Sequence, residues 1–147
     1  METKTKRHNL IFLLVLLMAL STKISAQEFY LFVGKSVNYL TDNKGKPDFI
    51  KNNGTSKIYQ YLEGGNSNIV FNVTNGNVNV AMKGIKSTSA TKAKELSSIQ
   101  ILYYMSLGFN KQGSEAGMTI LKKDNRVLSI GYMIDPDGSY STMITAL

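Results

Sequence analysis

The sequence contains no cysteine and no tryptophan, and His8 is its only histidine. A Ser-His-Asp triad and a Cys-His pair need a histidine, and a zinc site of the Cys/His type needs several Cys or His ligands. After residue 8 the chain contains neither histidine nor cysteine. Without cysteine, disulfides cannot stabilise the fold and no lipid can be attached to a lipobox cysteine. We therefore expect no catalytic residue of these classes, no metal site and no cofactor.

The N-terminal residues 1–26 have the pattern of a secretory signal peptide. A basic head with Lys4, Lys6 and Arg7 precedes the apolar run from Leu10 to Leu20, and small residues follow up to Ala26. The apolar run is too short to cross a membrane, which takes about 20 residues. The pattern predicts cleavage after Ala26 and a secreted or periplasmic protein with no membrane span after cleavage. An uncleaved N-terminal anchor is the alternative.

The positive charge is spread along the chain. The net charge is +7, and removing the signal peptide leaves a mildly basic single domain over residues 27–147. No basic run is longer than Lys122-Lys123, whereas nucleic-acid-binding proteins concentrate their basic charge on one face or segment. We therefore expect a solvated basic surface and no nucleic-acid partner.

Gly34-Lys35-Ser36 is the end of a possible phosphate-binding loop. Such a loop has the spacing G-x-x-x-x-G-K-[ST], so that glycine amides can wrap around the phosphates. Phe29 stands where the first glycine belongs, and bulky residues fill positions 30–33. The sequence therefore predicts no nucleotide binding.

Two β-hairpins can be placed with their register. In residues 69–82, the dipeptide Asn75-Gly76 suits a two-residue turn that pairs Val73 with Val78, Phe71 with Val80 and Ile69 with Met82. In residues 127–147, the turn at 135–138 needs a left-handed residue, which Gly138 supplies. The second turn pairs Ile134 with Tyr140, Tyr132 with Thr142, Ile130 with Ile144 and Leu128 with Ala146. Further strands are expected at 57–62 and 118–122, with Met118 and Ile120 on the face of Tyr132 and Ile130.

Two helices are expected, one short and one long. The short helix begins at Ser36, which caps its free amides after a turn at Gly34, and it ends at Gly45 before Pro47. The long helix spans residues 91–109 and ends at Gly108, which suits a left-handed C-terminal cap. Its inward face is predicted from the three-to-four spacing of Leu96, Ile99, Tyr103 and Leu107.

The order of these elements predicts an α+β fold made of two α-β-β-β units, residues 34–85 and 89–147. We expect an antiparallel sheet with the helices packed on one face. The first half resembles the BamE/SmpA-like envelope proteins and the β-lactamase-inhibitor-protein-like fold. The matching residues are Gly34, Lys35 and Ser36, then Gly45, Pro47 and Asp48, then Asn75, Gly76 and Val78. The resemblance implies a related envelope domain, although this chain lacks the lipidated cysteine of the lipoprotein.

The candidate binding residues are aromatic and amide side chains. Tyr59 and Tyr61 share a strand face, and Asn72 and Asn79 belong to a polar strip of the first hairpin. Such residues suit contact with a protein or a sugar, whereas packing of both tyrosines under the helices is the alternative. We expect a non-enzymatic binding or scaffold module whose partner is a protein or envelope component, with a carbohydrate as a further candidate.

Two other functions stay open at this stage. An inhibitor-type module would block the cleft of a partner enzyme, and aromatic residues at its hairpin tips would favour it. A carboxylate-based hydrolase would need two acids that converge in a pocket, drawn from residues such as Asp48, Glu63 and Glu115.

Overall fold

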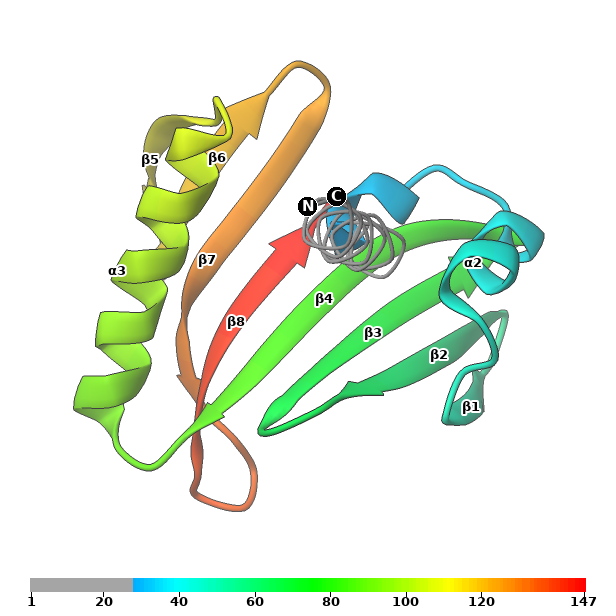
Figure 1. Ribbon diagram of the computed structural model, residues 1–147, viewed down its shortest axis with the longest axis horizontal. Helices are drawn as coiled ribbons and strands as arrows, with labels where there is room; N and C mark the ends of the chain where they lie inside the picture. Colours follow the sequence, from blue (N-terminus) through cyan, green and yellow to red (C-terminus); the bar gives the residue numbers. More distant parts are fainter. Residues whose placement is uncertain (1–27) are drawn as a thin grey trace, which may run out of the picture.

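The computed structural model describes residues 28–147, so the predicted signal peptide lies outside the described residues. Figure 1 shows one curved sheet with helices on its inner side. The elements are η1 (Phe29–Phe32), α2 (Val37–Lys44), β1 (Phe49–Asn53), β2 (Ser56–Glu63), β3 (Ser67–Thr74), β4 (Asn77–Ser87), α3 (Ala90–Ser106), β5 (Asn110–Glu115), β6 (Met118–Lys123), β7 (Arg126–Ile134) and β8 (Tyr140–Ala146).

All eight strands join a single antiparallel sheet in the order β1-β2-β3-β4-β8-β7-β6-β5. The prediction of two α-β-β-β units is therefore wrong, because each helix is followed by four strands. The sequence analysis missed the edge strands β1 and β5, whose sequences FIKNN and NKQGSE are short, largely polar and lack clear alternation. The two halves of the chain meet in the middle of the sheet, where β4 pairs with β8.

Both helices pack on the inner face of the sheet. The Thr142 hydroxyl of β8 donates to the Ala93 carbonyl of α3 at 2.8 Å. At the other end of the same face, the Tyr61 hydroxyl of β2 donates to the Gly45 carbonyl, which closes α2, at 3.1 Å. Between them lies one hydrophobic core, whose largest fully buried apolar side chains are Tyr104, Phe32, Phe71, Phe109, Leu40, Leu121, Leu128, Ile130, Ile144 and Val78.

The short helix α2 begins and ends at turn-forming residues. Gly34 has φ +81°, and the Ser36 hydroxyl accepts a hydrogen bond from the Tyr39 amide at 3.2 Å. Gly45 closes the helix with φ +85°, a backbone geometry that costs little without a Cβ. Pro47 then follows on the way into β1, where it cannot continue the helix.

The hairpin of β7 and β8 has the expected register. Ile134 pairs with Tyr140, and the pairing continues through Ile130 with Ile144 to the far end of both strands. Gly138 has φ +80° in the connecting turn. The turn and the apolar pattern agree on this register, because it places the apolar residues of both strands on the same face.

The hairpin of β3 and β4 differs from its expected register. Val73 pairs with Val78, but Asn72 then pairs with Val80, so Asn79 is an extra residue in a β-bulge. Beyond the bulge, Phe71 pairs with Ala81 and Ile69 with Lys83. The predicted pairs Phe71–Val80 and Ile69–Met82 are therefore wrong, and Val80 and Met82 point to the outer face.

A similar one-residue error affects β6. A two-residue loop at 124–125 joins β6 to β7, so Leu121 pairs with Leu128 on the inner face. Met118 and Ile120 therefore lie on the outer face, contrary to the prediction that they share the face of Tyr132 and Ile130.

The long helix α3 buries a different face from the predicted one. It ends at Gly108, which has φ +91°, before the buried Phe109. The small residues at the sheet contact let the helix approach closely, and the large ring of Tyr104 contacts Tyr30 of η1 and Phe109, which precedes β5. The residues of α3 that are buried are Ala93, Ser97 and Tyr104, whereas Ile99 and Tyr103 of the predicted stripe are exposed.

Candidate functional site

The outer face of the sheet carries apolar side chains that no described element covers. Gln60, Val70, Met82 and Thr145 form one row across β2, β3, β4 and β8. Phe49 extends this row onto β1, where it pairs with Gln60. Because both helices pack on the inner face, residues 28–147 leave these side chains in contact with solvent. We call the apolar set the outer patch: Phe49, Ile58, Leu62, Val70, Met82 and Met143.

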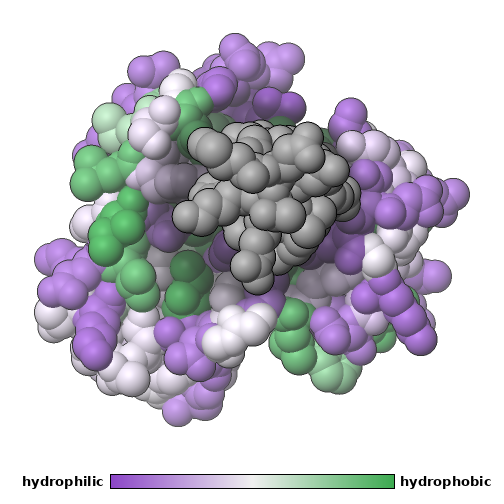
Figure 2. All heavy atoms as spheres, viewed as in Figure 1, coloured by the Kyte–Doolittle hydropathy of each residue, from purple (hydrophilic) through white to green (hydrophobic). Residues whose placement is uncertain are grey.

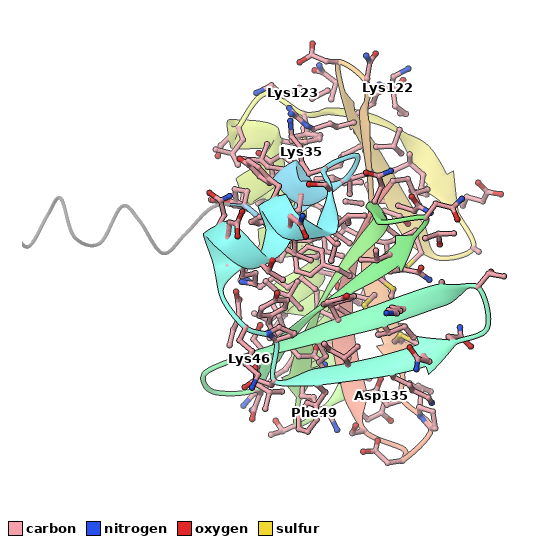
Figure 3. All side chains as sticks on the ribbon, turned by 90° about the vertical axis from the view of Figure 1, so that its right-hand side faces the viewer. Lys35, Lys46, Phe49, Lys122, Lys123 and Asp135 are labelled. Atoms are coloured by element: carbon pink, nitrogen blue, oxygen red, sulfur yellow. The ribbon has the colours of Figure 1, made fainter. Side chains whose placement is uncertain are left out.

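Two glycines shape the middle of the outer face. Gly84 of β4 and Gly131 of β7 pair with Met143 of β8 from its two sides. These three residues form the next outward-facing row, two residues along the strands from Met82. A Cβ on Gly84 would come within 2.6 Å of the Asn68 Oδ1, and a Cβ on Gly131 would overlap the Met118 sulfur. Neighbouring side chains therefore lie flat across both glycines, and Figure 3 shows side-chain sulfur atoms on the side of the sheet away from α2.

The outer patch could have been found from incomplete alternation. Val70, Met82 and Met143 are large apolar residues at positions that face outward once the register is known. A strand with one solvated face alternates apolar and polar residues. These three positions break that alternation, and the bulge at Asn79 hid the pattern in β4.

A second exposed apolar surface runs along α3. Ile99 is 56% and Leu102 is 66% exposed, and Tyr103 lies beside them. We call these three residues the α3 ridge, and Figure 2 shows hydrophobic side chains gathered over this helix. The Tyr103 hydroxyl donates to the Glu28 carboxylate, and this hydrogen bond, with some burial, raises the pKa of Tyr103 to about 12.

The structure does not bring the four predicted binding residues together. Tyr61 is buried, and Tyr59 is half-buried against the core on the same inner face. Burial is the main cause that raises the pKa of Tyr61 to about 12. Asn72 points to the opposite, outer face, and Asn79 is the exposed extra residue of the bulge. A binding role of these residues stays a prediction, and only Asn72 lies beside the outer patch.

Glu63 joins α2 to the sheet through two lysines. Its carboxylate lies 2.9 Å from the Lys44 ammonium and 3.2 Å from the Lys83 ammonium. Burial raises the pKa of Glu63, but the hydrogen bond and charge of Lys44, together with Lys83, outweigh burial and hold that pKa below its usual value. The folded state therefore favours the charged form of Glu63.

We predict that this ion pair makes stability fall in acid. Because the folded pKa of Glu63 is lowered, its contribution is complete above the unfolded pKa of 4.5 and is lost as the pH falls through the folded pKa. Urea midpoints of the wild type and Glu63→Gln should differ at about pH 7 and converge at about pH 3. Glu115→Gln, which alters an exposed residue, is the control. An unchanged difference between wild type and Glu63→Gln at both pH values would contradict the prediction.

Two of the three carboxylates considered for hydrolysis have other partners, and the third, Glu115, is exposed. Glu63 is held by two lysines, and the Asp48 carboxylate accepts the Leu62 amide at 2.7 Å. An open pocket of about 380 Å³ beside η1 is lined by one acidic side chain, that of Asp124, and has Arg126 over the Tyr30 ring. A paired acid and base needs two converging groups, so this geometry does not favour a hydrolase.

Residues 28–147 contain neither a carboxylate cluster suited to a metal ion nor a membrane-spanning helix. Within this range, no group of three or more Asp and Glu side chains is placed to hold a metal ion. No described helix is both long enough and apolar enough to cross a bilayer.

The comparisons with known proteins give only distant structural neighbours. No protein-family model matches the sequence, and no curated protein matches it. A cysteine-rich secretory protein from Staphylococcus aureus is similar over 80% of this chain, with 15% identity and a TM-score of 0.49. An extracellular protein containing an SCP domain from Bacillus anthracis is similar over 84%, with 10% identity and a TM-score of 0.41. The chain corresponds to 44% and 47% of these two proteins, so it spans less than half of either.

Proposed function

We propose that this chain is a secreted or periplasmic, non-enzymatic binding module that holds a protein partner against the outer patch. One observation carries the proposal: a broad sheet face with large apolar side chains remains uncovered in residues 28–147. Exposed apolar side chains gathered on one face of a sheet are typical of interaction sites. Export rests on the signal-peptide pattern of residues 1–26.

The side chains of the outer patch favour a protein over a carbohydrate. Sugar sites present aromatic faces for stacking, and Phe49 is the only aromatic residue of the patch. Methionines such as Met82 and Met143 are flexible and polarisable, and they are enriched where proteins contact one another. A protein surface with apolar anchors is therefore the partner that this patch suits best.

The hairpin loops do not favour an inhibitor that inserts an aromatic tip. The loops that join paired strands in residues 28–147 consist of small, amide and acidic residues, such as Gly54-Thr55, Asn75-Gly76 and Ala116-Gly117. None of the loops in this range contains an aromatic residue. Binding through the broad outer face remains the better-supported mode.

The test is a crosslinking pull-down from an envelope and medium extract of the source cells, with residues 27–147 as bait. Changing Met82 and Met143 together to glutamine should reduce capture of the partner about tenfold, because buried contact residues each contribute on the order of 1–2 kcal/mol. Both side chains are half-exposed, so the fold should survive.

The matched control is Ile99→Gln with Leu102→Gln, which removes the same kind of side chain from the α3 ridge. This control should leave capture unchanged. The opposite result would contradict the proposal and place the interface on α3: the double variant of Ile99 and Leu102 loses the partner, while the double variant of Met82 and Met143 captures it normally.

A further inference from the structure

Within residues 28–147, the edge strand β1 is open along its whole length. It forms one margin of the described sheet and pairs there only with β2 (Figure 1). All five of its residues are exposed. An edge strand presents a row of backbone N–H and C=O groups that another extended chain can pair with.

The opposite edge, β5, has features that discourage such pairing. Its register shifts between Lys111 and Gly113, so Gln112 is an extra residue in a bulge. Bulges, glycine and charged residues are the usual means by which an edge is protected. The strand carries no large apolar side chain, as its sequence NKQGSE shows.

The β1 edge has the opposite character. Its register with β2 is regular, without a bulge. Phe49 is 58% and Ile50 is 57% exposed, and alternation places them on opposite faces of the sheet. A ninth strand beside β1 would cover both side chains, and Phe49 also belongs to the outer patch.

The charge around β1 is positive. Lys46 precedes the strand, Lys51 lies in it, and Lys57 follows on β2; none of the three forms an ion pair with residues 28–147. The nearby Asp48 carboxylate accepts the Leu62 amide and keeps its negative charge, so the three lysines still leave the edge with a net positive charge. Figure 3 shows Lys46 and Phe49 at the same end of the molecule. An added strand that carries carboxylates would complement this edge.

A second copy of the chain is a poorer occupant. If two β1 strands paired antiparallel about a twofold axis in full overlap, Lys51 of each copy would lie opposite Lys51 of the other. Like charges directly opposite each other destabilise a strand pair. Lys46 and Lys57 would add to the repulsion.

We propose that β1 binds an extended, acidic segment of the protein partner as a ninth strand of the sheet. The segment has apolar residues in alternation, one of which contacts Phe49 and continues onto the outer patch. Backbone hydrogen bonds supply affinity in this mode, and side chains on the two faces supply specificity. The inference rests on the proposed binding function and adds the class of the recognised segment.

The turn after β1 shows which residues direct their backbone groups outward. Gly54 has φ +61°, and Asn53 pairs with Ser56 across a two-residue loop. Such a turn closes with a hydrogen bond between its end residues, so Asn53 faces β2. Alternation then directs the backbone groups of Ile50 and Asn52 away from β2. Ile50→Pro removes an outward N–H, a change that an edge strand tolerates.

The experiment selects linear peptides from a random phage-displayed library on residues 27–147. We expect enriched peptides with alternating apolar residues and a net negative charge. The synthetic consensus peptide should bind at least about tenfold more weakly to Ile50→Pro and to Lys51→Glu, which changes an exposed side chain. Gln112→Pro on the β5 edge should bind the peptide like the wild type. Added salt should weaken binding to the wild type.

Three results would overturn the inference. The first is enrichment of no peptide, or of peptides without acidic residues. The second is equal affinity of the consensus peptide for the wild type, Ile50→Pro and Lys51→Glu. The third is a wild-type dimer in sedimentation that Ile50→Pro dissolves, because the occupant would then be a second copy. The Ile50→Pro variant is also compared with the double glutamine variant of Met82 and Met143 in the pull-down. If Ile50→Pro still captures the partner from the extract and the double variant does not, the proposed function stands without the β1 site.

Discussion

Replacing Phe71 with alanine is expected to lower the free energy of unfolding by about 3–5 kcal/mol, the range for large-to-small changes of a buried aromatic side chain. Phe71 is fully buried in the middle of β3. Its ring makes edge contacts with Phe32 at 5.4 Å and with Tyr61 at 5.8 Å between centroids. It therefore connects η1 with β2 and β3, and its loss would leave a cavity lined by rings that cannot all move inward.

The measurement is urea unfolding of residues 27–147, followed by circular dichroism. Phe49→Ala is the matched control, because it removes the same side chain from an exposed position and should change stability by less than about 0.5 kcal/mol. A similar loss for both variants would show that burial does not distinguish Phe71 from Phe49, and would contradict the described core.

Replacing Gly131 with valine is expected to destabilise the protein by about 1–3 kcal/mol, because the added side chain overpacks the outer face. A Cβ at this position would overlap the Met118 sulfur and come within 3.1 Å of the Gly117 carbonyl. The methionine side chain can rotate away, but the backbone of the loop before β6 must also shift.

A double-mutant cycle separates these two contributions. Met118→Ala combined with Gly131→Val should recover a large part of the loss, since the two side chains compete for one space. Additive effects in urea unfolding would contradict the packing of Met118 over Gly131. The same cycle tests the outer face itself, because this contact exists only if Met118 points away from the helices.

The sequence predicted those parts of the fold that depend on turn chemistry. Gly138 and the apolar residues of β7 and β8 agree on one register, and the structure has that register. In β3 and β4 the turn at Asn75-Gly76 was placed correctly, but the bulge at Asn79 was not. An unbulged register would put Val80 and Met82 on the inner face, whereas the observed register puts Ala81 and Lys83 there. The apolar pattern therefore favoured the wrong register.

The inward face of α3 could not be predicted for a related reason. Apolar residues surround this helix, and the buried face is chosen by tertiary contacts: small residues at Ala93 and Ser97 approach the sheet, and Tyr104 meets Tyr30 and Phe109. Those partners lie far away in the sequence. The candidate site was missed because the same register errors placed outer-face methionines in the core.

The position of β8 has a consequence for the order of folding. It is the last strand along the chain, yet it lies between β4 and β7 in the middle of the sheet. Before residues 140–146 are available, the four strands β1–β4 and the three strands β5–β7 have no strand to join them, and β4 and β7 are open edges. The sheet can therefore close only after the last strand is available. Contacts so distant in sequence also make this closure slow.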